Sequence, residues 1–266
     1  MKKSLLLIFA TAALASCSEY QQALKNENVG EKYQIAQKYY HAGKYKKALG
    51  LMEQIVPVYR GKPQAEQLMF MYANTFYNLE DFYLSGYQFE RFEQSYPSSD
   101  SVEIAAYRSA RSYYELSPRY SLDQKDTHKG LEKLQNFIDN YSESEYRQEV
   151  NGLVTELRNK LEKKDYEVAN QYLKISDYKA AIEAFDNFIL DHPGSPYRKD
   201  AFYGRLKASY ELAINSLPHL VKERLETSKS HYNSFLKYFS ESDLKEDADE
   251  ISQDIEKRLG SYNTNS

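Results

Sequence analysis

The sequence predicts an all-α protein, a solenoid of about five helix hairpins. Two observations predict this fold class. The 266 residues include only 10 glycines and 7 prolines, and small and aromatic residues recur at fixed offsets along the chain. A helix hairpin of about 34 residues cannot bury its apolar face alone, so such units stack on their neighbours.

The clearest copy of this pattern spans residues 166–197. Ala169 and Ala181 have the spacing at which the two helices of a hairpin can cross closely. Tyr178 and Phe185 are expected to fill the wedge between neighbouring hairpins, and Pro193 to end the second helix. The remaining pattern positions of this copy are Tyr172 and Phe188. This arrangement is that of the tetratricopeptide repeat, with tyrosine taking the bulky positions because the chain contains no tryptophan.

The same offsets recur in four further copies. The third and fifth copies are interrupted between their two helices, at residues 117–129 and 215–229. The pattern positions of the other copies are Ala36, Tyr39, Tyr45, Ala48, Met52 and Ile55; Ala73, Phe76, Phe82, Ser85, Phe89, Phe92 and Pro97; Ala110, Tyr113, Gly130, Leu134, Phe137 and Tyr141; and Leu206, Tyr210, Leu212, Tyr232, Phe235 and Phe239.

Residues 144–174 connect the third copy to the fourth. They contain no proline, and Val150, Leu153, Leu157 and Leu161 follow helical spacing. The pattern predicts one long helix; two helices that break near residues 163–164 are the alternative.

The N-terminus has the pattern of a lipoprotein signal. Lys2 and Lys3 precede a short apolar stretch, which is typical of a secretory signal peptide over residues 1–16. Cys17, the only cysteine, follows an aliphatic and two small residues, as in the bacterial lipobox. We therefore predict that Cys17 is lipidated and begins the mature chain; the alternative is an ordinary signal peptide with an incidental cysteine.

The residues after Cys17 predict the location. The aspartate that some bacteria use for inner-membrane retention is absent, and residues 18–22 hold a single acid rather than an acidic run. This favours the outer membrane, with the protein on its periplasmic face and anchored by acyl chains, each buried CH₂ contributing about 0.8 kcal/mol.

Charge and motifs exclude several function classes. Without residues 1–16 the chain carries 33 basic and 39 acidic side chains, a net charge of −6, which disfavours nucleic-acid binding. The five histidines are scattered, and no phosphate-binding loop or nucleophile elbow occurs. We expect no catalytic residue, no metal site and no cofactor. His192 is expected to meet the C-terminal dipole of its helix.

The combination of lipobox, repeats, the LDQKD stretch that includes Asp123 and Gln124, and the copy that closes DHPGSPY resembles the BamD family of lipoproteins of the outer-membrane β-barrel assembly machinery. The resemblance implies a periplasmic scaffold that binds an Omp85-type (BamA-like) barrel insertase, other lipoproteins of the machinery and unfolded barrel-protein clients.

The same resemblance implies a division of labour along the chain. Residues 17–28 would form a lipidated linker, residues 29–98 the client-binding half with copies one and two, residues 99–260 the insertase-binding half with copies three to five, and residues 261–266 a disordered tail. A Tyr- and Phe-rich groove suits an extended apolar peptide, such as the aromatic C-terminal segment of a client.

Two other classes of protein share these repeats. A periplasmic tetratricopeptide coordinator of the cell envelope generally has no lipobox and often has an N-terminal coiled coil. A SusD-type glycan-binding lipoprotein is usually about twice this length. An enzyme is the third alternative.

Overall fold

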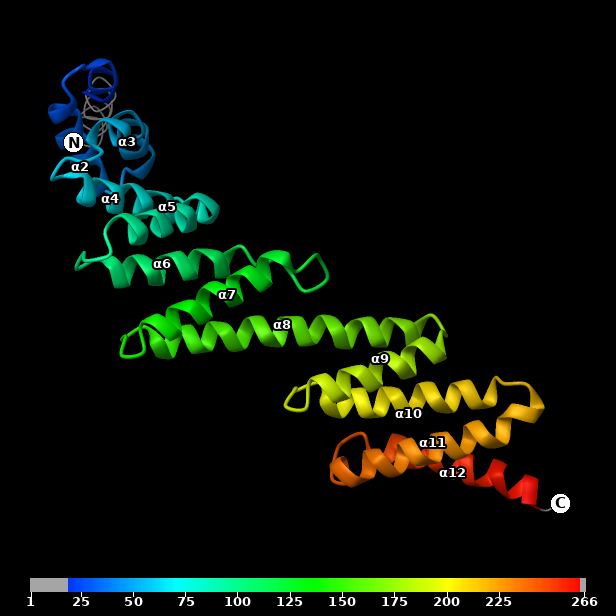
Figure 1. Cartoon of the computed structure of the whole chain (residues 1–266). Coiled ribbons are helices and arrows are strands. Elements are labelled where there is room, and N and C mark those ends of the chain that lie inside the picture. Colours follow the sequence, from blue (N-terminus) through cyan, green and yellow to red (C-terminus); the bar gives the residue numbers. More distant parts are fainter. Residues whose placement is uncertain (1–18, 264–266) are drawn as a thin grey trace, which may run out of the picture. The chain divides into compact units, whose positions relative to one another are not determined.

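The computed structural model describes residues 19–263, and this part of the chain consists of helices, turns and loops without a β-strand (Figure 1). A short helical segment, residues 19–25, comes first. The helices that follow are α2 (Val29–His41), α3 (Tyr45–Tyr59), α4 (Ala65–Asn78), α5 (Phe82–Ser95), α6 (Val102–Glu115), α7 (Lys125–Asn140), α8 (Arg147–Lys174), α9 (Tyr178–Asp191), α10 (Arg198–Ile214), α11 (Pro218–Phe239) and α12 (Lys245–Asn263).

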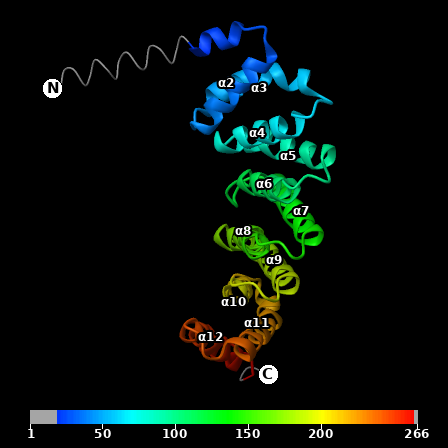
Figure 2. The same ribbon diagram turned by 90° about the vertical axis from the view of Figure 1, so that its left-hand side faces the viewer.

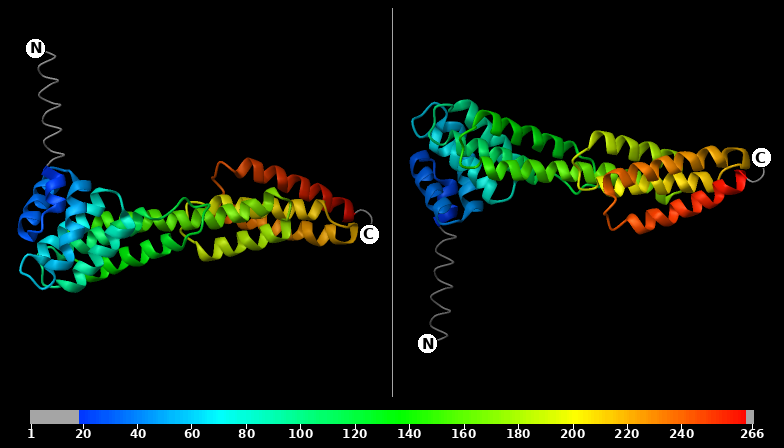
Figure 3. Two further views of the ribbon diagram at one scale, coloured as in Figure 1. Left: turned by 90° about the horizontal axis from the view of Figure 1, so that it is seen from above. Right: turned by 90° about the horizontal axis from the view of Figure 1, so that it is seen from below.

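Consecutive helices pair as hairpins, α2 with α3, α4 with α5, α6 with α7, the second half of α8 with α9, and α10 with α11 (Figures 1 and 2). The prediction of an all-α fold of stacked tetratricopeptide-like hairpins is confirmed. α12 lies beside α11 (Figure 3), and its Ala248 and Ile255 are buried against the last hairpin. These contacts cover apolar side chains of the last hairpin, among them Leu206 and Leu225.

The chain forms two compact units. Unit 1 runs up to Pro118 and includes Gln124–Leu157, and unit 2 comprises Arg119–Asp123 and the residues from Arg158 onwards. The division falls within α8, which is unbroken through residues 163–164, so the predicted long helix is confirmed. It begins at residue 147 rather than 144, because Ser144 forms the preceding turn and its Oγ accepts a hydrogen bond from the backbone of Tyr146.

Each unit has cores of the predicted pattern residues. In unit 1, Phe89 and Phe92 are fully buried beside Ala73 and Ala105. In unit 2, Phe185 is fully buried in a cluster with Ala169 and Ala181. The alanines allow the two helices of a hairpin to approach closely, and the aromatic rings fill the space that remains.

The turn between the two helices is the same in the first, second and fourth hairpins. Gly43, Glu80 and Ser176 occupy its left-handed position, with φ of 68°, 61° and 63°. The next residue then donates its backbone N–H to the carbonyl five residues earlier, at distances of 2.8, 3.0 and 3.0 Å. Asp81 and Asp177 also cap the second helix, since their side chains accept from backbone N–H groups of the first turn.

Several predicted boundaries differ from the structure. The interruption at 117–129 is shorter, because α7 begins at Lys125, and most of the interruption at 215–229 is helical, because Pro218 starts α11. Residues 261–263, expected to begin a disordered tail, belong to α12. Tyr172 has a core position in the repeat pattern but is exposed, because it lies in the part of α8 that extends beyond the start of α7.

Candidate binding surfaces

Cys17, the predicted lipidation site, lies outside the described residues. The segment that follows it packs on the first hairpin: Ala23 is buried, and the ring of Tyr20 meets that of Tyr39 edge-on at 5.9 Å. Lys32 is buried and donates from Nζ to Gln54 Oε1 (2.5 Å) and to the backbone carbonyl of residue 24 (3.4 Å). The stretch predicted as a linker therefore contains a helix that is held against the fold.

A ladder of polar bonds joins the first helices of successive hairpins in unit 1. Tyr33 of α2 donates to Gln67 of α4 (2.8 Å). About two helical turns after Gln67 on the same helix, Asn74 donates from Nδ2 to Tyr40 Oη of α2 and accepts at Oδ1 from Arg108 of α6. Tyr40, Asn74 and Arg108 are spaced by 34 residues in sequence, so equivalent positions of consecutive repeats meet in space.

Aromatic rings flank this ladder. Phe70 and Tyr77 lie one turn before and one turn after Asn74 on α4, and the guanidinium of Arg108 lies 5.8 and 5.7 Å from their ring centroids. Burial raises the pKa of the Tyr77 hydroxyl, so it stays a hydrogen-bond donor at neutral pH. We call this surface the first-helix face; it consists of Tyr33, Tyr40, Gln67, Phe70, Asn74, Tyr77 and Arg108.

The two arginines of α6 have different partners. Arg108 bonds to the neutral amide of Asn74, whereas Arg111 pairs with the carboxylates of Glu115 (3.0 Å) and Glu149. Tyr107 also donates to Glu149, and burial followed by this hydrogen bond raises the pKa of Tyr107 to about 12. The half-buried rings of Tyr40, Phe70 and Tyr77, together with a guanidinium on a neutral partner, suit an extended peptide with aromatic side chains and a carboxylate.

A polar cleft of about 420 Å³ lies between α5, α6 and α7. Lys133 Nζ lies 2.8 Å from Glu90 Oε1 within it. Burial raises the pKa of Glu93, and the nearby Glu90 adds to the effect while Lys133 opposes it. Asn136 and Asn140 line the same cleft, so its wall offers both donors and acceptors.

Unit 2 exposes an apolar surface on the second half of α8. Val168 and Tyr172 of α8 are 43% and 36% exposed, Ile175 in the turn after α8 is 64% exposed, and Leu122 of the loop before α7 is 47% exposed. Val168 also borders a cleft of about 320 Å³, whose other lining residues are Tyr120, Ser121, Lys164, Glu167, Gln171 and Lys174. Exposed large apolar side chains that gather on one element are typical of a protein-binding surface. We call these four residues the α8 apolar face.

The LDQKD stretch has a structural role. Gln124 is buried and accepts at Oε1 from Thr127 (2.7 Å), whose hydroxyl also lies 2.6 Å from that of Ser117. The carbonyl of Leu122 accepts from Lys164 Nζ (2.5 Å). These bonds fix the loop before α7, so buried Gln124 shapes the fold rather than a surface.

The structure places the histidines apart. His192 is the C-cap residue of α9, as its expected place at the helix end required, and its backbone N–H donates to the carbonyl of Phe188 (3.0 Å). Its Nε2 lies 3.2 Å from Asp165, and its ring packs on Phe188. His231 is largely buried, and burial followed by the charge of Arg205 lowers its pKa to about 4. Among the residues that the structure describes, no group of three or more His, Cys, Asp or Glu side chains could hold a metal ion.

A helix that crosses a bilayer needs about 20 predominantly apolar residues. None of the helices between residues 19 and 263 is both long enough and apolar enough to do so.

The sequence pattern missed the first-helix face. It selected positions that repeat as apolar residues, whereas the ladder is made of positions that repeat with different polar residues. The 34-residue spacing of Tyr40, Asn74 and Arg108 was the available signal.

Comparison with known proteins gives the chain its relatives. It is 25% identical over 126 residues to the outer membrane protein assembly factor BamD of Caulobacter vibrioides; the match covers 47% of this chain and 41% of that relative, so the chain spans less than half of its length. The solved structures matched include the TPR2AB domain of yeast Sti1 in its pHSP90 complex (TM-score 0.40, 13% identity, covering 86% of this chain and 98% of that chain). A second matched structure is a Podospora anserina kinesin light chain with nearly identical TPR-like repeats (TM-score 0.33, 13% identity, covering 79% of this chain and 96% of that chain).

Residues 25–219, nearly three quarters of the chain, match the family YfiO, described as an outer membrane lipoprotein. This match runs from the docked N-terminal segment to the first turn of α11. The chain is therefore a member of the YfiO family of outer membrane lipoproteins.

Proposed function

We propose that this protein is a non-catalytic scaffold for the folding and insertion of β-barrel proteins into the outer membrane. The observation that carries the proposal is membership of the YfiO family, together with the similarity to a relative named as an outer membrane protein assembly factor. The repeat fold is consistent with this role, because stacked hairpins offer extended surfaces for other proteins.

The anchor is Cys17, lipidated on its sulfur, which holds the protein on the periplasmic face of the outer membrane. The Cys17→Ala variant is expected to fold normally and to leave the membrane fraction, since no described helix could replace the acyl chains. Fractionation of cells with immunodetection measures this. Unchanged recovery in the outer membrane would contradict the anchor.

The partners are an Omp85-type (BamA-like) insertase and other lipoproteins of the same machinery. A tagged protein purified in mild detergent is expected to recover the insertase in near-equal amounts. Recovery of peptidoglycan-synthesis or division proteins alone would contradict the proposed function and favour a cell-envelope coordinator.

The first-helix face binds unfolded clients, within the residues 29–98 expected to form the client-binding half and extending to Arg108. A peptide that ends in alternating aromatic residues and a free carboxylate is the probe. The Phe70→Ser and Arg108→Gln variants are expected to weaken its binding about tenfold each, because the first removes a stacking ring and the second a charged donor. Tyr83→Ser, at an exposed ring on the second helix of the same hairpin, is the matched control.

The α8 apolar face binds the insertase, within residues 99–260. Ile175→Asp would place a charge where apolar contact is expected and should reduce the recovered insertase at least tenfold. Val58→Asp, which introduces the same charge at an exposed apolar residue of α3, is the control. Equal loss with both variants would show that solubility rather than docking is affected.

A further inference from the structure

Charge is distributed unevenly along the chain. Residues 19–62, which comprise the docked N-terminal segment and the first hairpin, carry eight basic and four acidic side chains, a net charge of +4. Residues 63–266 carry 25 basic and 35 acidic side chains, a net charge of −10. The N-terminal hairpin is thus a positive region on a negative protein, and such asymmetry indicates a negatively charged partner.

The structure gathers four of these lysines at one end of the first hairpin, around the turn that contains Gly43. Lys38 is near the end of α2, and Lys44, Lys46 and Lys47 are at the start of α3. We call these four residues the basic patch. A hollow of about 390 Å³ lies among them, lined by Gly43, Lys44, Tyr45, Lys46, Lys47 and Leu79.

Two lysines of the basic patch contact the first described residues. Lys47 Nζ lies 5.6 Å from the ring centroid of Tyr20, and Lys38 Nζ lies 2.6 Å from Glu19 Oε1. The ring of Tyr20 is fixed there, since its hydroxyl lies 2.6 Å from the position that a Cβ at Gly50 would take. The basic patch is therefore built around the point at which the chain enters the fold.

Connectivity ties this point to Cys17. Glu19 is two residues after Cys17, and an extended chain spans at most about 3.6 Å per residue, so the two Cα atoms lie within roughly 7 Å. A membrane that holds acyl chains on Cys17 is then close to the basic patch, within a Debye length of about 8–10 Å for its nearest groups.

We propose that the basic patch binds the anionic phosphate headgroups of the membrane in which Cys17 is anchored, and so sets the orientation of the first hairpin on that membrane. This inference rests on the proposed lipidation of Cys17. Glu19 offsets part of the charge of Lys38, so Lys44, Lys46 and Lys47 supply most of the attraction. A lysine near an anionic surface favours the bound state about fivefold.

The experiment supplies the anchor chemically. The chain from Cys17 onwards has a single thiol, which is coupled to a maleimide lipid in vesicles of phosphatidylcholine with or without phosphatidylglycerol. Lysine acetylation is then followed by mass spectrometry. On vesicles with phosphatidylglycerol, Lys44, Lys46 and Lys47 are expected to react about fivefold more slowly than on neutral vesicles, and high salt should abolish the difference. The exposed Lys207 and Lys222 of unit 2 are internal controls and should react equally on both.

A variant extends the test. In the K44Q/K46Q/K47Q variant, whose fold is checked by circular dichroism, Lys38 and Lys25 should be acetylated at equal rates on both kinds of vesicle. The K207Q/K222Q variant should behave as wild type. Equal reactivity of the wild-type basic patch on both kinds of vesicle would overturn the proposal. So would protection by inorganic phosphate on neutral vesicles, which indicates a free-phosphate site, or protection only by a client peptide.

This result is independent of whether cells lipidate Cys17, because the tether is chemical. Protection on anionic vesicles combined with unchanged fractionation of Cys17→Ala would support the basic patch and contradict the proposed anchor. Equal reactivity on both kinds of vesicle, combined with loss of Cys17→Ala from the membrane fraction, would contradict the basic patch and support the proposed anchor.

Discussion

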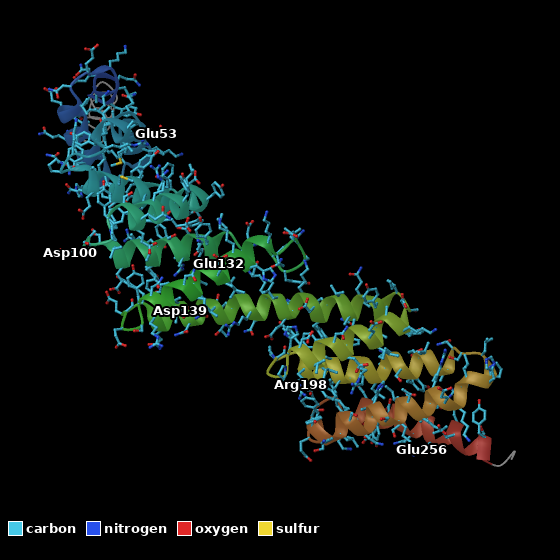
Figure 4. All side chains as sticks on the ribbon, viewed as in Figure 1. Glu53, Asp100, Glu132, Asp139, Arg198 and Glu256 are labelled. Atoms are coloured by element: carbon cyan, nitrogen blue, oxygen red, sulfur yellow. The ribbon has the colours of Figure 1, made fainter. Side chains whose placement is uncertain are left out.

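Unit 1 and unit 2 are built from the same hairpin, yet they differ in what joins their repeats. In unit 1, the first helices of consecutive hairpins are linked side chain to side chain, as Asn74 links Tyr40 to Arg108. In unit 2, the polar bonds between helices end on carboxylates: Arg205 of α10 pairs with Asp186 of α9 (2.6 Å), Tyr210 of α10 donates to Asp254 of α12 (2.7 Å), and Lys229 of α11 pairs with the Glu256 labelled in Figure 4. The second half of α8 meanwhile exposes apolar residues.

The difference teaches that the repeat pattern encodes the cores of the hairpins and leaves their faces open to other uses. Phe89 and Phe185 have equivalent places in the two units and are both fully buried. Tyr113 and Tyr172 also have equivalent places, but the first is buried and the second is exposed, since the ring of Tyr113 packs on Gly86 of the preceding hairpin. The comparison of the two units can be tested by substitutions, first in the hairpin cores and last in the turns between helices.

The largest effect is expected for the core rings. Phe89→Ala in unit 1 and Phe185→Ala in unit 2 should each lower the free energy of unfolding by about 3–5 kcal/mol, because each leaves a cavity. Hydrogen exchange with mass spectrometry should show faster exchange mainly in the unit that carries the change, since repeats contact only their neighbours. Equal acceleration across both units would mean that they unfold as one.

The ladder of unit 1 comes next. Asn74→Ala should lower the free energy of unfolding by about 1–3 kcal/mol, because the buried Asn74 bonds to both Tyr40 and Arg108 and its loss leaves their polar groups without this partner. Asn233→Ala, at an exposed site on α11, should change it by less than about 0.5 kcal/mol. Similar values from urea unfolding would refute a special role of the ladder.

A pH effect is expected in unit 2. The folded-state pKa of His231 is about 4 and the unfolded value about 6.5, so between these values the unfolded chain binds more protons. Stability should therefore fall as the pH is lowered from about 6.5 to about 4, by about 1–2 kcal/mol once partial solvent exposure is allowed for. His231→Gln should remove this part of the pH dependence, whereas His219→Gln, at an exposed site, should keep it.

The smallest effect concerns the shared turn. Ser176→Gly in unit 2 and Glu80→Gly in unit 1 should each stabilise the protein by about 0.5–1 kcal/mol, because glycine adopts a positive φ without the strain of a side chain. Gly43→Ala should destabilise it by a similar amount at the equivalent position. Thermal unfolding measures all three, and a stabilising Gly43→Ala would contradict the equivalence of the turns.

Much of the fold could be predicted from sequence because apolar periodicity is local. The offsets around Ala169, Ala181 and Phe185 predicted the hairpin, and the proline-free stretch before it predicted α8. Boundaries were less accurate where polar residues continue a helix without changing its core, as at the start of α7 and of α11. Polar residues in these stretches are compatible with both helix and loop.

The candidate surfaces were less predictable. Lys44, Lys46 and Lys47 are a short run in sequence, and only the docking of Tyr20 against Lys47 brings this run to the N-terminal entry of the chain. The lipidation of Cys17 is a prediction from sequence alone, because the lipobox is a contiguous motif that depends on no fold.

The sequence by itself determined the all-α class, the number of hairpins, the positions of their cores and the candidate anchor, because each depends on residues within one helix hairpin or one short motif. Only the tertiary structure decided which equivalent positions meet across repeats, which aromatic residues stay exposed on α8, and where the lysines of the first hairpin gather. Those properties depend on contacts between residues about 20 to 40 positions apart, as Tyr20–Lys47 and Tyr40–Asn74 illustrate, and burial and charge at such sites are fixed only when the hairpins pack.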